Sequence, residues 1–242
     1  YGFPTDVVEL RTNHLTIPDA HQVELQRDLR IAISEFAPGN EIVAAGRLWV
    51  SAGIYRPPAR NWEPKKYGIC GQCKRLALYP FSYSEKPKCS SCGETIDRLH
   101  TFIIPEFGFL VGRDEPRLVR SARPKRVGRP GKTYFAEYRR PDGENDQMVS
   151  YQPVSGLASN IAKADKYYSR YGWLVSINNM EYRTCEYCGY SFPITSMPSK
   201  TGHNNPLTGQ PCRGKLQTLN LGHRFMTDVL EIRFAGAIPL RL

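Results

Sequence analysis

The sequence predicts an α+β fold that is mainly antiparallel β-sheet with one clear N-terminal helix. Three observations support this class: one stretch has apolar residues at helical spacing, several segments alternate between apolar and polar residues, and seven cysteines are gathered in two groups. The composition is that of an ordinary globular protein, and the 242 residues are enough for a sizeable core.

Four segments are expected along the chain. They are 1–60, a connector with the helix and a β-hairpin; 61–112, a four-cysteine module and the strand after it; 113–147, a basic loop and a strand; and 148–242, a β region with the second cysteine module.

The first segment begins as an extended connector with one short strand at 7–10. Asp19 and Gln22 have the spacing of a helix-capping box, and Pro38-Gly39 ends the helical pattern. The apolar face expected in the core is Leu25, Leu29, Ala32, Ile33 and Phe36. The alternating stretch 41–54, with Gly46 at its centre, predicts a β-hairpin.

The second segment carries a C-x2-C-x15-C-x2-C pattern made by Cys70, Cys73, Cys89 and Cys92. This spacing is typical of a zinc ribbon, in which two knuckles at the ends of two hairpins hold one ion. Four thiolates leave no open position for substrate or water, so a structural zinc ion is expected.

A second zinc module is expected near the end of the chain. Cys185 and Cys188 form a C-x2-C knuckle closed by a glycine, and Cys212 supplies a third sulfur from the far end of a polar loop. His203, inside that loop, is favoured as the fourth ligand over His223, which lies in a strand-like run. The chain is therefore expected to hold two zinc ions.

Positive charge is concentrated in one part of the chain, whose formal net charge is +10. Residues 1–45 contain seven acidic and three basic residues, whereas residues 111–140 contain ten basic and three acidic ones. Such asymmetry is typical of a protein that binds a polyanion, although a solvated basic loop is the alternative. The expected nucleic-acid contacts are Arg113, Arg117, Arg120, Arg123, Lys125, Arg126, Arg129 and Lys132.

Three later segments are expected to be strands. Residues 100–111 should form a strand that Pro105 confines to an edge or a bulge. Residues 166–177 should bury their odd positions and expose Lys166, Tyr168 and Arg170, which could also stack a base. Residues 221–234 carry apolar residues at both parities, as in a strand covered on both sides, so Asp228 should need a partner.

No catalytic site is predicted. The stretch GRPGKT lacks the first glycine of a phosphate-binding loop, because Arg126 occupies that position, and a strand-like segment follows it. Neither H-x-E nor H-E-x-x-H occurs, which argues against a zinc deaminase or metalloprotease. Asp142, Glu144 and Asp146 could hold a divalent metal in a nuclease, but PDGEND has the composition of a turn.

The sequence contains no apolar run long enough to span a membrane and no signal-like start, and cysteines in C-x2-C pairs suit a reducing compartment. A cytoplasmic, nucleoid-associated protein without membrane contact is expected. The first residue is Tyr1 rather than Met, which suggests a part of a longer protein.

The stretch LGHRFMTDVLEIRF, preceded by C-x2-C, a histidine and a further cysteine, resembles the MrfA-like zinc-binding C-terminal region of superfamily 2 DEAD/DEAH helicases. The similarity is strongest at 27–54 and 185–234, and the four-cysteine ribbon departs from it. The resemblance implies that Cys185, Cys188, His203 and Cys212 are the metal ligands. It also implies a DNA-acting, ATP-driven motor in DNA repair or in DISARM-like phage defence.

Two functions follow as expectations. The first is a DNA-engaging accessory region of a helicase, with motor lobes in cis or in trans, in which zinc fixes the loops and basic residues hold phosphates. The second is a zinc-containing scaffold that docks a helicase or nuclease partner within a defence complex and binds no DNA itself.

Overall fold

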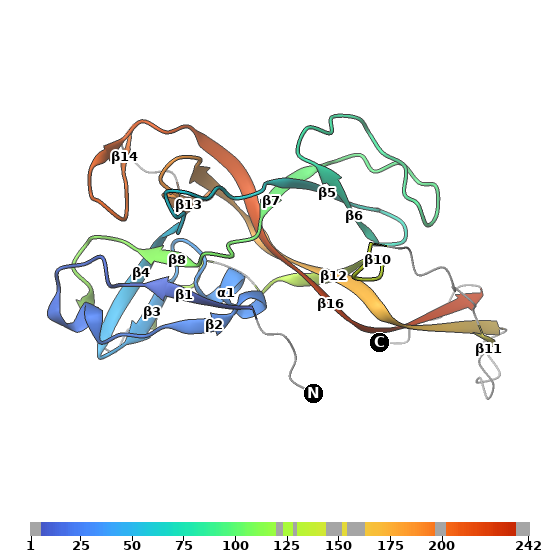
Figure 1. The fold of residues 1–242 in the computed structure, drawn as a ribbon, viewed down its shortest axis with the longest axis horizontal. Helices are drawn as coiled ribbons and strands as arrows, with labels where there is room; N and C mark the ends of the chain where they lie inside the picture. Colours follow the sequence, from blue (N-terminus) through green and yellow to red (C-terminus); the bar gives the residue numbers. More distant parts are fainter. Residues whose placement is uncertain are drawn as a thin grey trace. The chain divides into compact units, whose positions relative to one another are not determined.

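The structure, a computed structural model, describes residues 6–119, 123–127, 130–143, 152–153, 163–196 and 202–235. Within these ranges the protein is mostly β, so the expected α+β class is wrong. The strands form a six-stranded sheet, an eight-stranded sheet and a two-stranded hairpin (Figure 1).

The six-stranded sheet has the order β2-β1-β8-β4-β3, and β9 also pairs with β4. Its strands are β1 (Val7–Arg11), β2 (Gln26–Asp28), β3 (Glu41–Ala44), β4 (Arg47–Ile54), β8 (Phe109–Val111) and β9 (Arg117–Leu118). The pairs β1–β2, β3–β4, β4–β8 and β4–β9 are antiparallel, and β1–β8 is parallel. The expected short N-terminal strand and the expected hairpin at 41–54 are confirmed.

The helix α1 (Leu29–Glu35) is much shorter than expected, and its N-cap is Asp28, whose carboxylate accepts a hydrogen bond from the backbone N–H of Arg30 at 2.9 Å. Asp19 lies in a separate 3-10 helix, η1 (Pro18–His21). The residues just before α1 form β2, because pairing with β1 satisfies their backbone groups. The spacing that suggested one helix therefore runs across a strand and a helix.

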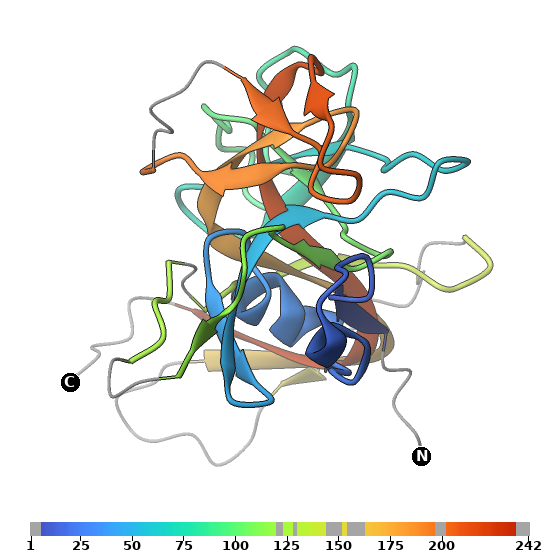
Figure 2. The same cartoon turned by 90° about the vertical axis from the view of Figure 1, so that its left-hand side faces the viewer.

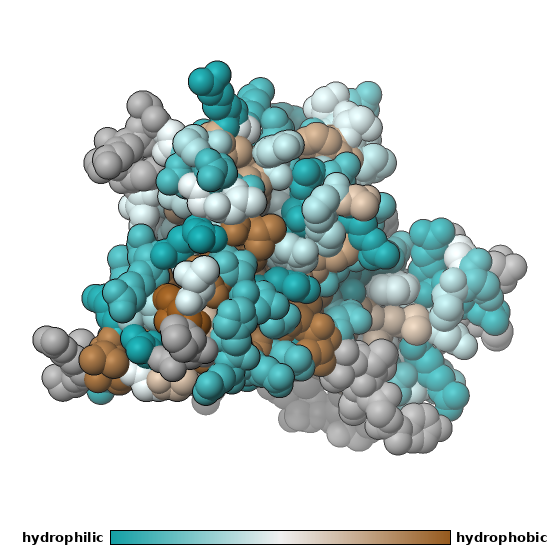
Figure 3. Space-filling model, turned by 60° about the vertical axis from the view of Figure 1, so that its left-hand side comes forward, coloured by the Kyte–Doolittle hydropathy of each residue, from teal (hydrophilic) through white to brown (hydrophobic). Residues whose placement is uncertain are grey.

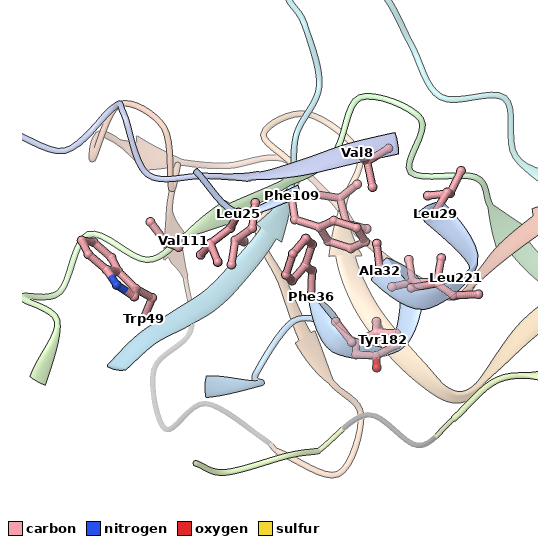
Figure 4. Close-up of a cluster of buried hydrophobic side chains, with 14 of the residues drawn as sticks. Val8, Leu25, Leu29, Ala32, Phe36, Trp49, Phe109, Val111, Tyr182 and Leu221 are labelled. Atoms are coloured by element: carbon pink, nitrogen blue, oxygen red, sulfur yellow. The ribbon is translucent and has the colours of Figure 1, made fainter. Parts of the chain in front are cut away.

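The main core lies where α1 meets β1, β8 and β4 (Figure 2). All five residues of the predicted apolar face are buried there. Phe36 packs edge-on against Phe109 with ring centroids 6.1 Å apart, and Figure 4 shows both rings between Leu25 and Ala32. Trp49 and Tyr182 are also fully buried in this cluster. Aromatic side chains bury large areas, so they contribute much of the hydrophobic stabilisation here.

The eight-stranded sheet has the order β10-β12-β16-β7-β5-β6, with β11 and β13 also paired to β12. Its strands are β5 (Lys65–Ile69), β6 (Leu76–Pro80), β7 (His100–Ile103), β10 (Lys132–Tyr138), β11 (Gln152–Pro153), β12 (Lys163–Cys185), β13 (Ser191–Pro193) and β16 (Leu216–Ala235). The remaining strands, β14 (His203–Asn204) and β15 (Pro211–Cys212), form the separate hairpin.

The expected strand at 100–111 is in fact two strands, β7 and β8, in different sheets. Pro105 lies in the turn between them, where its carbonyl accepts a hydrogen bond from the N–H of Gly108 at 3.0 Å. β7 is not an edge strand, because it pairs with β5 on one side and with β16 on the other. Proline therefore ends β7 instead of confining one long strand to an edge.

The chain divides into two compact units, Tyr1–Tyr134 with Ser176–His223 and Phe135–Val175 with Arg224–Leu242. In the second unit, Tyr167 and Val175 of β12 are buried while Lys166, Tyr168 and Arg170 are exposed, as expected. In the same unit, the Arg224 guanidinium lies 4.0 Å from the ring centroid of Trp173. The expected four-segment division stays a prediction.

β16 is covered on both faces only around 219–223. For the rest of 221–234, the expectation of a strand covered on both sides is wrong. Asp228 is exposed and so needs no buried partner. Leu230, Ile232 and Phe234 are exposed as well. The apolar residues at both parities therefore reflect an exposed apolar side in addition to the packed one.

Hydrophilic residues cover most of the face drawn in Figure 3, with smaller hydrophobic patches between them. In the described part of the chain, no helix has the length and apolar character needed to cross a membrane.

Candidate metal centres and nucleic-acid interface

The first candidate metal centre lies beside β5 and β6 in the first unit and is made by Cys70, Cys73, Cys89 and Cys92. The Cys70 and Cys92 sulfurs are 3.5 Å apart, as are those of Cys73 and Cys89. A tetrahedral site with Zn–S bonds of about 2.3 Å separates two sulfurs by about 3.8 Å. The four thiols are thus arranged closely enough to ligate one ion.

The second candidate centre brings together Cys185, Cys188, Cys212 and His203. In both centres all ligand atoms lie within 4.8 Å of one another, and the Cys185 and Cys212 sulfurs are 3.8 Å apart. His223 is not in this cluster; its Nε2 lies 2.9 Å from Asp6 Oδ2. The structure therefore brings His203, and not His223, together with the three thiols.

The His203 ring is positioned to be a ligand. It stacks on Tyr190 with centroids 5.0 Å apart and an interplanar angle of 10°, and its Nε2 is buried without a hydrogen-bond partner. Burial lowers the pKa of His203, which favours the neutral imidazole that metals bind. A histidine that is grouped with three thiols and has a buried ring nitrogen without a hydrogen-bond partner fits the role of a metal ligand.

All three knuckles share one backbone turn. The N–H of the first cysteine donates to the carbonyl five residues on, and its own carbonyl accepts from the N–H four residues on. These first cysteines are Cys70, Cys89 and Cys185, and the donor–acceptor distances lie between 2.7 and 3.1 Å. The residue four positions after the first cysteine has a positive φ in each knuckle; these residues are Lys74, Gly93 and Gly189. This geometry aims both sulfurs of a knuckle at one point.

The loop that carries His203 and Cys212 contains a fourth copy of this turn without cysteines. Asn205 N–H donates to the Gln210 carbonyl at 2.8 Å, Gly209 N–H donates to the Asn205 carbonyl at 2.7 Å, and Gly209 has a φ of 78°. The Asn205 side chain accepts from the N–H of Leu207, much as Cys185 Sγ accepts from the N–H of Tyr187. The ligands come instead from the paired residues His203 and Cys212 of β14 and β15.

The two clusters have the composition of structural metal sites. Each offers four candidate ligands, which is a closed set, and all seven cysteines are free of disulfide bonds. The backbone N–H of Cys73 holds the pKa of the Cys70 thiol down at about 6, whereas burial raises the pKa of Cys188. Two metal ions can be held, one in each cluster.

The basic segment, residues 113–132, is hydrogen-bonded to the β3–β4 hairpin. The Glu41 backbone N–H donates to the Lys125 carbonyl at 2.8 Å, and the Glu41 carboxylate accepts from the Lys125 N–H at 2.8 Å and from the Arg117 side chain. Asn40 Oδ1 accepts from the N–H of Val127 at 2.7 Å. The backbone is thus anchored at Lys125 and Val127, while the side chains of Arg123, Lys125 and Arg126 are exposed.

The other predicted contacts differ in their surroundings. Arg113 donates from Nη1 to the Leu207 carbonyl at 2.9 Å, so it supports the loop of the second metal centre. Lys132 is exposed at the start of β10. Arg120 and Arg129 lie outside the described residues, as do Glu144 and Asp146, and Asp142 forms an ion pair with Arg140 at 3.4 Å.

Sequence reasoning missed the role of Arg113 and the cysteine-free turn. The second could have been found from NNPLTGQ, because Asn-Pro and a glycine four residues after Asn205 are turn signals. No local signal marks Arg113, since its partner is a backbone carbonyl 94 residues away.

The chain is similar to Druantia protein DruE of Escherichia coli (strain UMEA 4076-1), with 23% identity over 273 residues. The aligned region covers 99% of this chain and 14% of DruE, so the chain spans a small part of that protein's length. No protein-family model matches the chain. No solved structure matches it either.

Proposed function

We propose that this chain is a zinc-stabilised, DNA-engaging accessory region of a superfamily 2 helicase or translocase that acts in antiviral defence or DNA repair. The observation that carries the proposal is the pairing of two closed four-ligand clusters with an exposed, backbone-anchored basic segment in the same unit.

Zinc is the proposed ion at both centres. Four sulfurs, or three sulfurs and one imidazole nitrogen, in a tetrahedral arrangement are the ligand sets of structural zinc sites. The ion would hold the hairpin tips and the β14–β15 loop in place, and the residues around it would present the DNA-binding surface. It would supply folding energy and no chemistry.

The basic segment is proposed to hold backbone phosphates. Glu41 and Asn40 fix its main chain, so Arg123, Lys125 and Arg126 are presented with little loss of backbone entropy on binding. The described part of the segment contains no helix that could enter a groove, so contacts to phosphate should dominate over base readout.

The role beside a motor rests on two similarities. The resemblance to the C-terminal region of helicases implies a DNA-acting motor, and the similarity to a Druantia protein over almost the whole chain is consistent with the defence side of that expectation. Because the chain corresponds to 14% of DruE, motor lobes in cis or in trans and other defence-complex subunits are proposed as partners.

The test is a variant with Arg123→Ala, Lys125→Ala and Arg126→Ala. Because the bonds to Glu41 and Asn40 use backbone atoms of the segment, the variant should fold and retain its zinc. Three lost phosphate contacts should flatten the slope of log affinity against log salt by about 2.7 on duplex DNA and by about 2.1 on single strands. Fluorescence anisotropy across a salt series measures both.

The matched control removes three exposed bases from the ribbon surface, Lys86→Ala, Lys88→Ala and Arg98→Ala, with the same change in net charge. Its salt slope should stay close to that of the intact chain. A triple variant of the basic segment with the same slope as the intact chain would show that these bases are merely solvated.

That outcome would favour the second candidate, a scaffold that docks a helicase or nuclease partner. One observation supports it: Leu230, Ile232 and Phe234 expose apolar side chains at alternate positions of β16. Exposed apolar patches of this kind commonly mark protein interaction sites.

A further inference from the structure

Tyr187 is the most exposed of the large hydrophobic and aromatic residues in the described part of the chain, with 65% of its surface accessible. It stands between Cys185 and Cys188, in the turn that the second metal centre fixes. An aromatic side chain usually contributes to stability by being buried, so this ring, which is held out by a turn, contributes little to stability through burial.

A cavity of about 590 Å³ is lined in part by Tyr187 and by Cys212 of the second metal centre. Its walls include Tyr187, Pro211 and the hydrogen-bonding side chains of Asn205, Gln210 and Arg213. Ligand pockets commonly have volumes of about 300–1,000 Å³, so the cavity has room for a planar heterocycle beside the ring. One aromatic wall with polar groups around it suits a group that is flat, apolar on its faces and polar at its edges.

The surroundings carry positive charge. The Arg56 guanidinium lies 5.6 Å from the Tyr187 ring centroid, and the exposed Arg213 lines the cavity. Lys215 is also exposed, and its carbonyl accepts a hydrogen bond from the N–H of Glu186, a wall residue, at 3.0 Å. Glu186 is the acidic residue in the wall, and its carboxylate accepts a hydrogen bond from Gln217 Nε2 at 2.7 Å. A ligand with an anionic backbone and flat bases matches this combination.

We propose that this cavity binds one unstacked base of single-stranded nucleic acid, which stacks on Tyr187 while Arg56, Arg213 and Lys215 contact the flanking phosphates. The proposal rests on the proposed DNA engagement of this chain and adds a single-strand site to it. Base–aromatic stacking accepts any base, so the site should show little sequence preference.

A duplex cannot use this site, because its bases are stacked and paired with each other. Tyr187 should therefore distinguish single strands from duplex DNA, whereas the basic segment contacts phosphates in both. Such a distinction between single-stranded and duplex DNA suits a region that lies beside a strand-separating motor.

The experiment measures binding of a labelled oligothymidylate and of a blunt duplex to the 242-residue chain and to Tyr187→Ala. We expect the variant to bind the single strand roughly 5- to 150-fold more weakly, to bind the duplex as the intact chain does, and to keep the same salt slope. Tyr187→Trp should retain single-strand affinity. Phe81→Ala, which removes another exposed aromatic with a cation 5.9 Å from its ring, is the matched control and should change neither affinity.

Three results would overturn the inference: a Tyr187→Ala variant that binds the single strand like the intact chain, an equal loss for both probes, or a Tyr187→Trp variant as weak as the Ala variant. Zinc content is measured for each variant. If Tyr187→Ala loses metal, the single-strand affinities of Tyr187→Leu and Tyr187→Trp are compared instead, since both variants keep a large side chain. The inference then requires the Leu variant to bind the single strand more weakly than the Trp variant. An intact chain that binds neither probe would refute the DNA function itself, whereas the first three results leave that function standing.

Discussion

The two metal centres use the same knuckle turn but differ in what lies around it. The four-cysteine centre has a small core of its own, in which Cys70 and Cys89 pack with Ile96, and Cys73 and Cys92 are exposed. In the second centre the knuckle is packed against β4: Gly189 accepts a hydrogen bond from Ile54 N–H at 2.9 Å, and Tyr190 forms a β-bridge with Gly53. Ile54 belongs to the main core.

This difference indicates different consequences for folding. Loss of the metal from the four-cysteine centre should loosen a peripheral module, because its apolar contacts are mostly internal. Loss of the metal from the second centre should disturb β4 and the core beside it. Identical backbone turns can therefore carry unequal shares of the stability, depending on the surface they pack against.

The largest effect is expected from removing one ligand of each centre. Cys185→Ser and Cys92→Ser should each lower zinc content from two ions to one, because the clusters share no ligand. Apparent binding free energies of structural zinc are about 10 kcal/mol, so both variants should melt at lower temperature, Cys185→Ser by far more. Elemental analysis and thermal unfolding measure the two quantities. Equal melting temperatures for the two variants would contradict the difference between the centres.

A smaller effect is expected from the glycines that close two of the knuckles. Gly93 and Gly189 both have positive φ, so an alanine at either costs about 1–2 kcal/mol in backbone strain. A Cβ on Gly93 would meet no atom within 4 Å, whereas a Cβ on Gly189 would lie 1.9 Å from the Ile54 carbonyl oxygen.

Gly189→Ala should therefore lower the free energy of unfolding by more than about 3 kcal/mol, and Gly93→Ala only by the strain itself. Urea denaturation with zinc present measures both. If Gly93→Ala proves as destabilising as Gly189→Ala, the second knuckle is not held against β4 as described.

The knuckles were predictable from the sequence because they are local. The C-x2-C spacing, followed by a glycine in two of the three knuckles, indicates a turn whose hydrogen bonds span five residues, and the hairpin at 41–54 follows in the same way from alternation around Gly46. The fourth ligand was harder, since His203 and His223 are equivalent by residue type. Position in the loop favoured His203, and the structure adds the pairing of His203 with Cys212 across the β14–β15 hairpin and the contact of His223 with Asp6.

The failures all involve partners that are distant in sequence. Gln26–Asp28 forms β2 because β1 offers it a ladder, which outweighs a helical spacing that continues into α1. Asp228 was expected to be buried because both parities of its strand are apolar, but nothing in that pattern shows that one side remains exposed. The α+β class failed for the first of these reasons, since most of the expected helix is strand or loop.

The smallest expected effect concerns Arg113, which joins the basic segment to the second metal centre. Its guanidinium donates to the Leu207 carbonyl and packs against Gly209, where a Cβ would lie 2.9 Å from Arg113 Nε. Arg113→Gln should lower the free energy of unfolding by about 1 kcal/mol and speed amide exchange at Asn205 and Gly209, because a neutral, shorter side chain cannot support the turn. Hydrogen exchange followed by mass spectrometry measures the exchange rate of the loop directly.

Since the Arg113 guanidinium is bonded to a carbonyl, the salt slope of DNA binding should stay unchanged. Arg126→Gln, at an exposed base of the same segment, is the control and should lower the slope by about 0.9 on duplex DNA. A slope that falls by about 0.9 with unchanged exchange in the loop would instead make Arg113 a phosphate contact.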